Sequence, residues 1–266
     1  MKLKELIGYL EEVAPLRYQE TYDNAGLIVG DPDMDLTGAM ISLDATPEVI
    51  QEAIDSGCNV VVSHHPIIFK GIKKFDPTYY VHKSVTMAIK HDIAIYAIHT
   101  NLDNVLQNGV NQKIADKLSL QDVGVLKPHP QAHLETRYEL GSGAIGVLSK
   151  ALSPQVFIDH VKSSMNLQVI RHTKVLDKKI SKVAVCGGSG SFLLAAAKAA
   201  DAQAFITSDY KYHEFFDANN QIIILDIGHY ESEYYTIELL HNLISQKFHN
   251  FAAHCTKAIT NPVFYS

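Results

Sequence analysis

Residues 60–69 read VVVSHHPIIF, an apolar run that ends in two adjacent histidines and a proline. Three consecutive valines predict a strand that is buried on both faces, as in a parallel sheet covered by helices. Pro66 ends this strand, because proline has no N–H to donate to a neighbouring strand. His64 and His65 are therefore expected at the carboxyl end of a buried strand, where open α/β sheets bind their ligands. A core histidine beside a solvated one would also explain an isolated pair, so the rest of the chain must decide.

Strands and helices alternate along the whole chain. In the first half, apolar runs at 38–44, 58–65 and 93–103 predict strands, and 46–57 predicts a helix with Thr46 as N-cap and Pro47 in its first position. In the second half, strands are expected at 143–149, 182–188, 202–209 and 221–230, and a closing helix at 231–248. This order predicts an α/β fold with largely parallel sheets flanked by helices.

The two halves of the sequence resemble each other. Ser63-His64-His65 aligns with Thr207-Ser208-Asp209, and in the next strand His99 aligns with His229 and Asp103 with Glu233. Two such matches in the same order predict an internal duplication. We expect a first α/β half at residues 1–127 and a second at 128–266, with the boundary in the Pro-rich stretch 126–133. Packing of the C-terminal helix back on the first half is compatible with this division.

The composition is that of an ordinary globular protein. The chain has 266 residues, of which 47% are hydrophobic, and a net charge of −6, which disfavours nucleic acid or an anionic membrane as a partner. Its three cysteines form no CxxC pair, which is typical of a reducing compartment. The N-terminus predicts an amphipathic helix and not a signal peptide, and no apolar run is long enough to span a membrane. The expected location is the cytoplasm.

Five polar residues at predicted strand ends form a candidate metal site. They are His64, His65, Asp103, His229 and Glu233. Imidazole and carboxylate without thiolate are the ligands of Zn, Mn, Fe or Ni at catalytic sites. Because neighbouring side chains on a strand point opposite ways, we expect two divalent ions, one for each adjacent histidine, with Asp103 as the bridging ligand. The expected site therefore lies between the two halves.

Each residue taken alone also has a structural explanation. Asp103 could cap a helix that starts near Val105, Glu233 could be a first-turn acid, and His229 could be a buried, hydrogen-bonded histidine. Asp209 and His213 could orient ligands or move protons, but a cap with a surface histidine explains them equally well. Joint placement at equivalent strand ends favours the metal site.

The Gly-rich turn at 185–191 has two possible roles. It could cradle a phosphate, although it lacks the P-loop and dinucleotide fingerprints, or it could be a plain tight turn. Cys186 in this turn is a weak candidate nucleophile, since no base is evidently paired with it. No cofactor other than the metal ions is expected.

Six segments together resemble the Nif-three-like family (NGG-interacting-factor homologues), whose members often carry the label GTP cyclohydrolase 1 type 2 homologue. The segments are YDNAGLIVGD, SHHPIIF, IYAIHTNLDN, VAVCGGSGS, TSDYKYHEFFDA and DIGHYESE, which extend from residue 22 to 233. The resemblance implies a two-metal site at the five positions named above, two similar α/β halves and a ring-shaped homohexamer. It also implies hydrolytic attack at C8 of a guanine ring, with His99, His213 or Asp209 in outer support or proton transfer.

We therefore expect a dinuclear metal-dependent hydrolase that acts on a small, nucleotide-type substrate. Bound ions would polarise the substrate and make water nucleophilic near neutral pH. One alternative is a metal-binding oligomeric scaffold or regulator, in which the ions only stabilise the fold. Another is a two-metal phosphoesterase, which would use the same ions with a different pocket. Nothing in the sequence indicates a guanine pocket, so the metal site is better supported than the substrate.

Overall fold

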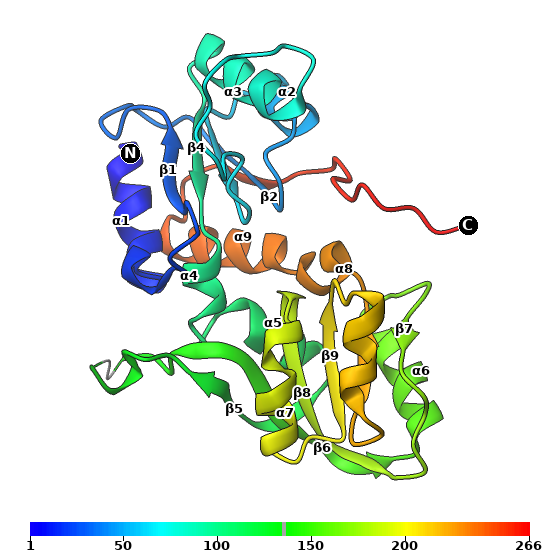
Figure 1. Cartoon of the computed structure of the whole chain (residues 1–266). Coiled ribbons are helices and arrows are strands. Elements are labelled where there is room, and N and C mark those ends of the chain that lie inside the picture. The colour runs from blue at the N-terminus through cyan, green and yellow to red at the C-terminus, as the bar shows by residue number, and fades with distance from the viewer. Residues whose placement is uncertain (135–136) are drawn as a thin grey trace. The chain divides into compact units, whose positions relative to one another are not determined.

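The computed structural model describes residues 1–134 and 137–266, which form two compact units (Figure 1). The first unit contains residues 1–102 and 236–262, and the second contains 103–235 and 263–266. The segment 236–262, with the C-terminal helix, thus groups with the first unit. The boundary expected at residues 127 and 128 falls inside a strand of the second unit, β5 (Leu120–Pro128). Pro128 is tolerated there because β5 lies at the edge of its sheet, where a missing N–H has no consequence.

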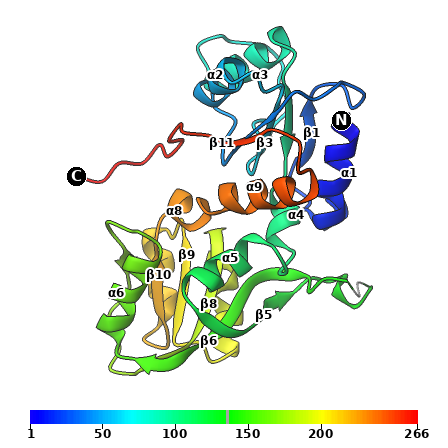
Figure 2. The same ribbon diagram turned by 180° about the vertical axis from the view of Figure 1, so that it is seen from behind.

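The first unit is built on a five-stranded sheet with the order β1-β4-β3-β2-β11. Its strands are β1 (Gly26–Val29), β2 (Ala39–Ser42), β3 (Val60–Ser63), β4 (Ala94–Ala97) and β11 (Ala253–Cys255). β11, β2, β3 and β4 run parallel, and only β1 is antiparallel to its neighbour. Figure 2 shows β11 at the edge of this sheet. The largely parallel arrangement expected from the sequence is confirmed here.

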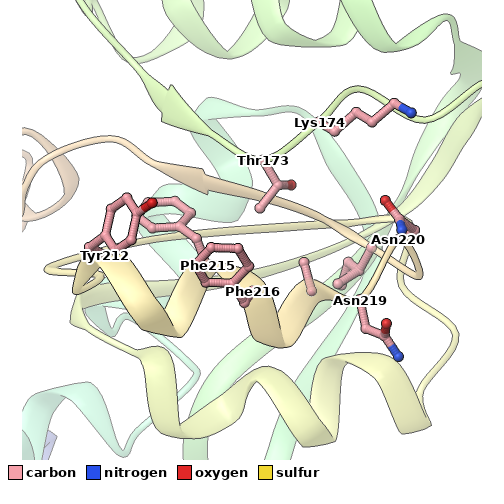
Figure 3. A pocket seen from close by; sticks show the side chains of 9 residues that line it. Thr173, Lys174, Tyr212, Phe215, Phe216, Asn219 and Asn220 are labelled. Atoms are coloured by element: carbon pink, nitrogen blue, oxygen red, sulfur yellow. The ribbon is translucent and has the colours of Figure 1, made fainter.

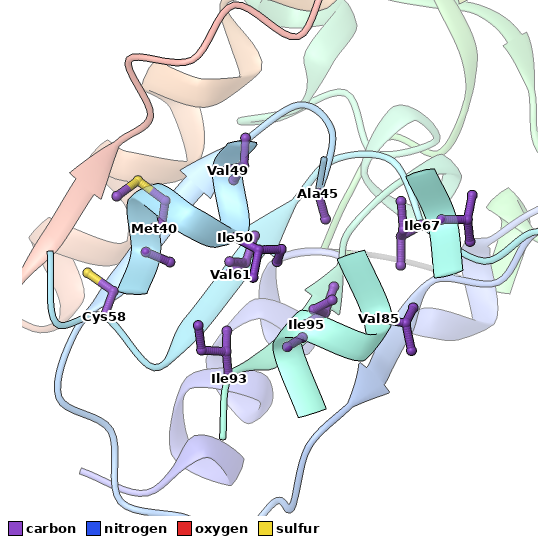
Figure 4. Packing of buried hydrophobic residues seen from close by; sticks show 13 residues of the cluster. Met40, Ala45, Val49, Ile50, Cys58, Val61, Ile67, Val85, Ile93 and Ile95 are labelled. Carbon is purple, nitrogen blue, oxygen red and sulfur yellow. The ribbon is translucent and has the colours of Figure 1, made fainter. Parts of the chain in front are cut away.

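The helices of the first unit follow the signals in the sequence. They are α1 (Leu3–Val13), η1 (Leu16–Tyr18), α2 (Pro47–Asp55), α3 (Tyr80–Lys90), α9 (Thr236–Lys247) and the short α4 (Thr100–Asp103), which ends on the first residue of the second unit. Thr46 is the N-cap residue of α2 and Pro47 its first residue, as predicted. The three valines of β3 are fully buried. Side chains of α2, α3 and the sheet, among them Ile50, Val61 and Val85, form one core cluster (Figure 4).

The second unit is built on a six-stranded sheet with the order β5-β6-β8-β9-β10-β7. Besides β5, its strands are β6 (Gly141–Leu152), β7 (Arg171–His172), β8 (Ile180–Ser189), β9 (Ala204–Ser208) and β10 (Ile223–Asp226). Only β8, β9 and β10 run parallel to one another. The expectation of a largely parallel sheet is therefore wrong for this unit. The edge strand β5 leaves Gln121, Asp122, Lys127 and Pro128 exposed, as antiparallel strands can and doubly covered parallel strands cannot.

The helices of the second unit are α5 (Val110–Lys117), η2 (Ala132–Leu134), α6 (Pro154–Ser164), η3 (Ser191–Leu193), α7 (Leu194–Ala199), η4 (Tyr212–Ala218) and α8 (His229–Glu233). The single closing helix expected at 231–248 is divided into α8 and α9, with a turn at Tyr234 and Tyr235 between them. Within the described ranges, no helix combines the length and the apolar content needed to cross a membrane.

Both units contain the same arrangement of three parallel strands. In the first unit β3 lies between β2 and β4, and in the second β9 lies between β8 and β10. β3 ends at Ser63 and β9 at Ser208, one residue before Asp209. The internal duplication itself stays a prediction, but the aligned residues do occupy matching strand ends.

Candidate functional site

Three histidines of the first unit form a compact cluster. His64 and His65 follow β3 directly, and His99 follows β4, so the parallel strands deliver all three to one edge of the sheet. The ring centroids of His64 and His65 are 4.9 Å apart, and the ring of His99 is 5.3 Å from each of them. One potential ligand atom from each ring lies within 4.8 Å of the other two. Such a cluster can hold a metal ion.

Each ring of this cluster is anchored through its Nδ1 atom. Nδ1 of His64 donates to the carbonyl oxygen of Ile98 at 2.8 Å. Nδ1 of His65 lies 2.8 Å from Asp44 Oδ1, and Nδ1 of His99 lies 2.8 Å from Asp23 Oδ1. Because these oxygens accept hydrogen bonds, each neutral ring carries its proton on Nδ1 and its lone pair on Nε2. This arrangement fixes the tautomer and orientation of a metal-binding imidazole.

The two anchoring carboxylates, Asp23 and Asp44, stay ionised. Burial raises the pKa of Asp23, but hydrogen bonds from His99, Thr100 and the Asn24 amide outweigh burial and lower this pKa to about 2. Burial also raises the pKa of Asp44. The hydrogen bonds from His65 and from the Thr260 hydroxyl, the latter at 2.7 Å, outweigh burial and lower this pKa below its ordinary value. Each carboxylate therefore places a negative charge against the imidazole that it holds.

A second group of candidate ligands lies in the second unit, at the start and end of α8. His229 Nε2 is 3.1 Å from Glu233 Oε2, and His229 Nδ1 is 2.7 Å from Asp209 Oδ2. Asp209 also accepts a hydrogen bond from the Ser189 hydroxyl. Burial lowers the pKa of His229, but the carboxylates on either side outweigh it and raise this pKa to about 11. With this pKa, His229 is protonated near neutral pH, and a metal ion that bound its ring would displace a proton.

The Gly-rich turn, whose Gly187 and Gly188 lie in the last residues of β8, makes room for Glu233. A Cβ on Gly188, which has a φ of +60°, would lie 2.5 Å from Glu233 Oε1. The Gly187 amide donates to Asn111 Oδ1 at 3.1 Å, and the Gly188 amide donates to Ser232 Oγ at 2.9 Å. Because side chains of the unit already occupy these two amides, neither is open to a phosphate. The turn admits a carboxylate to close contact with the backbone.

Asp103 is the last residue of α4 and is tied to the same turn. Its carbonyl oxygen accepts a hydrogen bond of 3.1 Å from Asn111, the residue that also binds the Gly187 amide. Helix α5 begins at Val110 with Gly109 as its N-cap residue, so the interpretation of Asp103 as a helix cap is wrong. Likewise Glu233 ends α8 and is not a first-turn acid. Burial, Asp103 and Glu233 together raise the pKa of the Cys186 thiol, which makes this cysteine a poor nucleophile.

His213 lies on η4 and is exposed. Its ring contacts those of Tyr212 and Phe216, at centroid distances of 5.1 and 6.3 Å. Beside η4 is an open recess of about 480 Å³, whose other wall includes Thr173 and Lys174 (Figure 3). A proton-transfer role for His213 stays a prediction, as does that of Asp209. Asp209 nevertheless has the contact with His229 that an orienting role requires.

Sequence reasoning did not identify the carboxylates that hold the histidine rings in place. His99, expected only to assist proton transfer, is a full member of the histidine cluster. Asp44 and Asp23 were not identified. Asp44 follows the end of β2 by two residues, a signal like that of the histidines after β3. Asp23 comes from a loop that precedes β1, and only the folded chain reveals its contact with His99.

Comparisons with known proteins give consistent results. A model of the family described as Duf34/NIF3 (NGG1p interacting factor 3) matches residues 1–262. A Clostridium acetobutylicum protein named GTP cyclohydrolase 1 type 2 homolog is 32% identical over 250 residues, which cover 94% of this chain and 91% of that protein. The crystal structure of a Staphylococcus aureus hypothetical protein aligns with a TM-score of 0.92 and 30% identity, covering 100% of this chain and 99% of the other. A Bacillus cereus protein related to NIF3 aligns with a TM-score of 0.90, 26% identity and the same coverage.

Proposed function

Because this chain belongs to the Duf34/NIF3 family, we propose that it is a dinuclear metal-dependent hydrolase that acts on a nucleotide-type substrate. The ligands in this proposal are His64 and His65 from the first unit and Asp103, His229 and Glu233 from the second. The family assignment confirms the resemblance inferred from the six sequence segments. The substrate class rests on the printed name of relatives such as the Clostridium acetobutylicum protein.

The observation that carries the proposal is the anchoring of every histidine of the cluster through Nδ1. Three imidazoles with a fixed tautomer and potential ligand atoms within 4.8 Å of one another are suited to a metal ion, and a packed core does not need them. The second unit fits the same chemistry, because it holds an imidazole between two carboxylates and keeps a glycine where a Cβ would displace Glu233. The donor set contains nitrogen and oxygen only, which is typical of catalytic sites.

Bound divalent ions would supply Lewis-acid polarisation of the substrate and a nucleophile derived from water at neutral pH. The residues of the chain would hold the histidine rings in place. Asp23 and Asp44 hold the rings of His99 and His65, and Asp209 holds His229. His99 is a candidate for proton transfer, because Asp23 holds its ring beside those of His64 and His65.

The test combines elemental analysis of purified protein with a hydrolysis screen against GTP and a phosphate monoester. The variant is His64→Ala, and the matched control is His249→Ala, which removes an exposed histidine of the same unit. We expect about two ions per chain in wild type and control, loss of metal in His64→Ala, and metal-dependent turnover of GTP. Fewer than one ion per wild-type chain would contradict the dinuclear site.

The same screen separates the alternatives. Turnover of the phosphate monoester without ring opening of GTP would indicate the two-metal phosphoesterase. A full complement of metal with no turnover of either substrate would indicate the metal-binding scaffold or regulator. The homohexamer implied by the family resemblance stays a prediction, which sedimentation equilibrium of the wild-type protein checks.

A further inference from the structure

The segment 69–80, with the sequence FKGIKKFDPTYY, combines lysines and aromatic rings beside the histidine cluster. We propose that it is the substrate-binding segment of the site, with Phe69 stacking on an aromatic base and Lys70, Lys73 and Lys74 binding phosphate groups. This inference rests on the proposed function, because it names the part of the protein that would hold a nucleotide at the proposed metal centre. The segment belongs wholly to the first unit.

The start of the segment is held at the cluster. Asn24 Nδ2 donates a hydrogen bond of 2.7 Å to the carbonyl oxygen of Ile68, and Asn24 is the neighbour of the Asp23 that anchors His99. The next residue, Phe69, places its ring 5.9 Å from the ring of His99 in an edge-to-face contact. Phe69 is nevertheless 53% exposed. A large ring that touches the cluster on one side and solvent on the other offers a stacking surface for a planar ligand.

The far end of the segment is also structured. Asp76 accepts hydrogen bonds from the Thr78 amide at 2.9 Å and the Thr78 hydroxyl at 2.7 Å, and its own amide donates to His82 Nδ1 at 2.8 Å. The rings of Phe75 and Tyr79 lie 5.5 and 5.0 Å from the ring of His82 on α3. The residues between 69 and 75 are therefore held at both ends, and they carry the lysines.

The charge of this segment is positive, whereas the net charge of the chain is negative. Lys70, Lys73 and Lys74 are all exposed, and no ion pair joins them to an acid in the part of the chain that the structure describes. Asp76, the only acid of the segment, is engaged in the turn with Thr78. The chain as a whole has a net charge of −6. A group of exposed lysines on an acidic chain attracts an anionic ligand to this segment.

These observations select the ligand class. Three lysines suit phosphate oxygens, which accept charge-assisted hydrogen bonds from ammonium groups. The exposed ring of Phe69 suits a planar base. Since an extended chain covers at most about 3.6 Å per residue, Lys74 lies no more than roughly 18 Å from Phe69, and a single nucleotide can contact both. The ligand that combines these features is a nucleoside di- or triphosphate.

The experiment is isothermal titration of the purified wild-type protein with GTP and with guanosine. The double variant Lys73→Ala/Lys74→Ala is expected to weaken GTP binding at least about tenfold, because a hydrogen bond to a charged group contributes about 1.5–3 kcal/mol. The same variant should leave guanosine binding unchanged. Phe69→Ala should weaken the binding of both ligands by a similar factor of about ten or more, because base stacking contributes about 1–3 kcal/mol. The double variant Lys73→Arg/Lys74→Arg should bind GTP as the wild type does.

The matched control is Lys178→Ala/Lys179→Ala, an adjacent exposed lysine pair in the second unit. It should bind GTP as wild type does. Equal GTP affinity in the Lys73/Lys74 variant and this control would overturn the proposal, and so would a wild type that retains its metal but binds no GTP. Metal content measured on the same samples distinguishes failure of the proposed binding segment from failure of the proposed metal centre. Lysine-dependent binding of GTP by a protein without metal would support the segment and refute the metal centre.

Discussion

Replacing Gly188 by alanine tests the contact between the Gly-rich turn and Glu233. A Cβ at this position would lie 2.5 Å from Glu233 Oε1 and 3.3 Å from both Glu233 Cδ and His229 Cε1. Carbon and oxygen atoms cannot approach to 2.5 Å without a bond, so the carboxylate must turn away. Glu233 is only 3% exposed, which leaves its side chain little space for this movement. The substitution should therefore displace a proposed ligand without removing it.

The expected energetic cost has two parts. Gly188 has a φ of +60°, and an L-residue in the left-handed region costs about 1–2 kcal/mol. The displacement of Glu233 adds a steric part. Gly57 provides the matched control, because it has a φ of +69° and a Cβ there would have nothing within 4 Å. Gly57→Ala therefore measures the backbone part alone, and Gly188→Ala should be destabilised by more than this control.

The assay is urea unfolding of both variants together with their metal content after dialysis against a competing chelator. Gly57→Ala should keep its metal. Gly188→Ala should lose affinity for metal by at least about tenfold, since even changes to groups that only support a ligand cost 10–100-fold. Equal destabilisation of the two variants, with full metal retention in Gly188→Ala, would refute the reasoning.

Three further predictions concern the carboxylates and histidines. Asp44→Asn removes the charge that holds His65, so metal affinity should fall about 10–100-fold in a chelator competition, and wild-type affinity would contradict this role. His229, whose pKa is raised to about 11, holds a proton at pH 7, so metal binding should release one proton per chain and tighten as pH rises. Calorimetry in buffers of different ionisation enthalpy measures this release, which His229→Gln should abolish. The pKa of Asp23 is lowered from 3.8 to about 2, so its stabilisation is complete above pH 3.8 and disappears as pH falls through 2. Asp23→Asn should therefore reduce the stability of the metal-free protein near pH 6 by about 1 kcal/mol after solvent screening, and should reduce it much less at pH 2, where half of the Asp23 side chains are protonated.

The sequence predicted the elements that carry the site because each has a strong local signal. The valines before His64 can only form a buried strand, and Pro66 ends it. Thr46, Pro47 and Gly57 mark the two ends of α2 by their backbone preferences. Where local signals were weak the predictions were incomplete. The edge strand β5 contains Gly124 and Pro128 and resembles a linker, so its antiparallel pairing with β6 was not expected.

The sequence by itself determined the chemical types of the candidate ligands and their positions at strand ends, because consecutive residues specify a buried strand and its end. The tertiary structure alone decided how those ligands are supported. Asp23 and His99, like Asp209 and His229, are far apart in the chain, and only strand pairing and loop return bring them within hydrogen-bond distance. The role of Gly188 likewise depends on a carboxylate from α8 that approaches its backbone. Hydrogen bonds and close contacts depend on three-dimensional distance, which residue spacing does not encode.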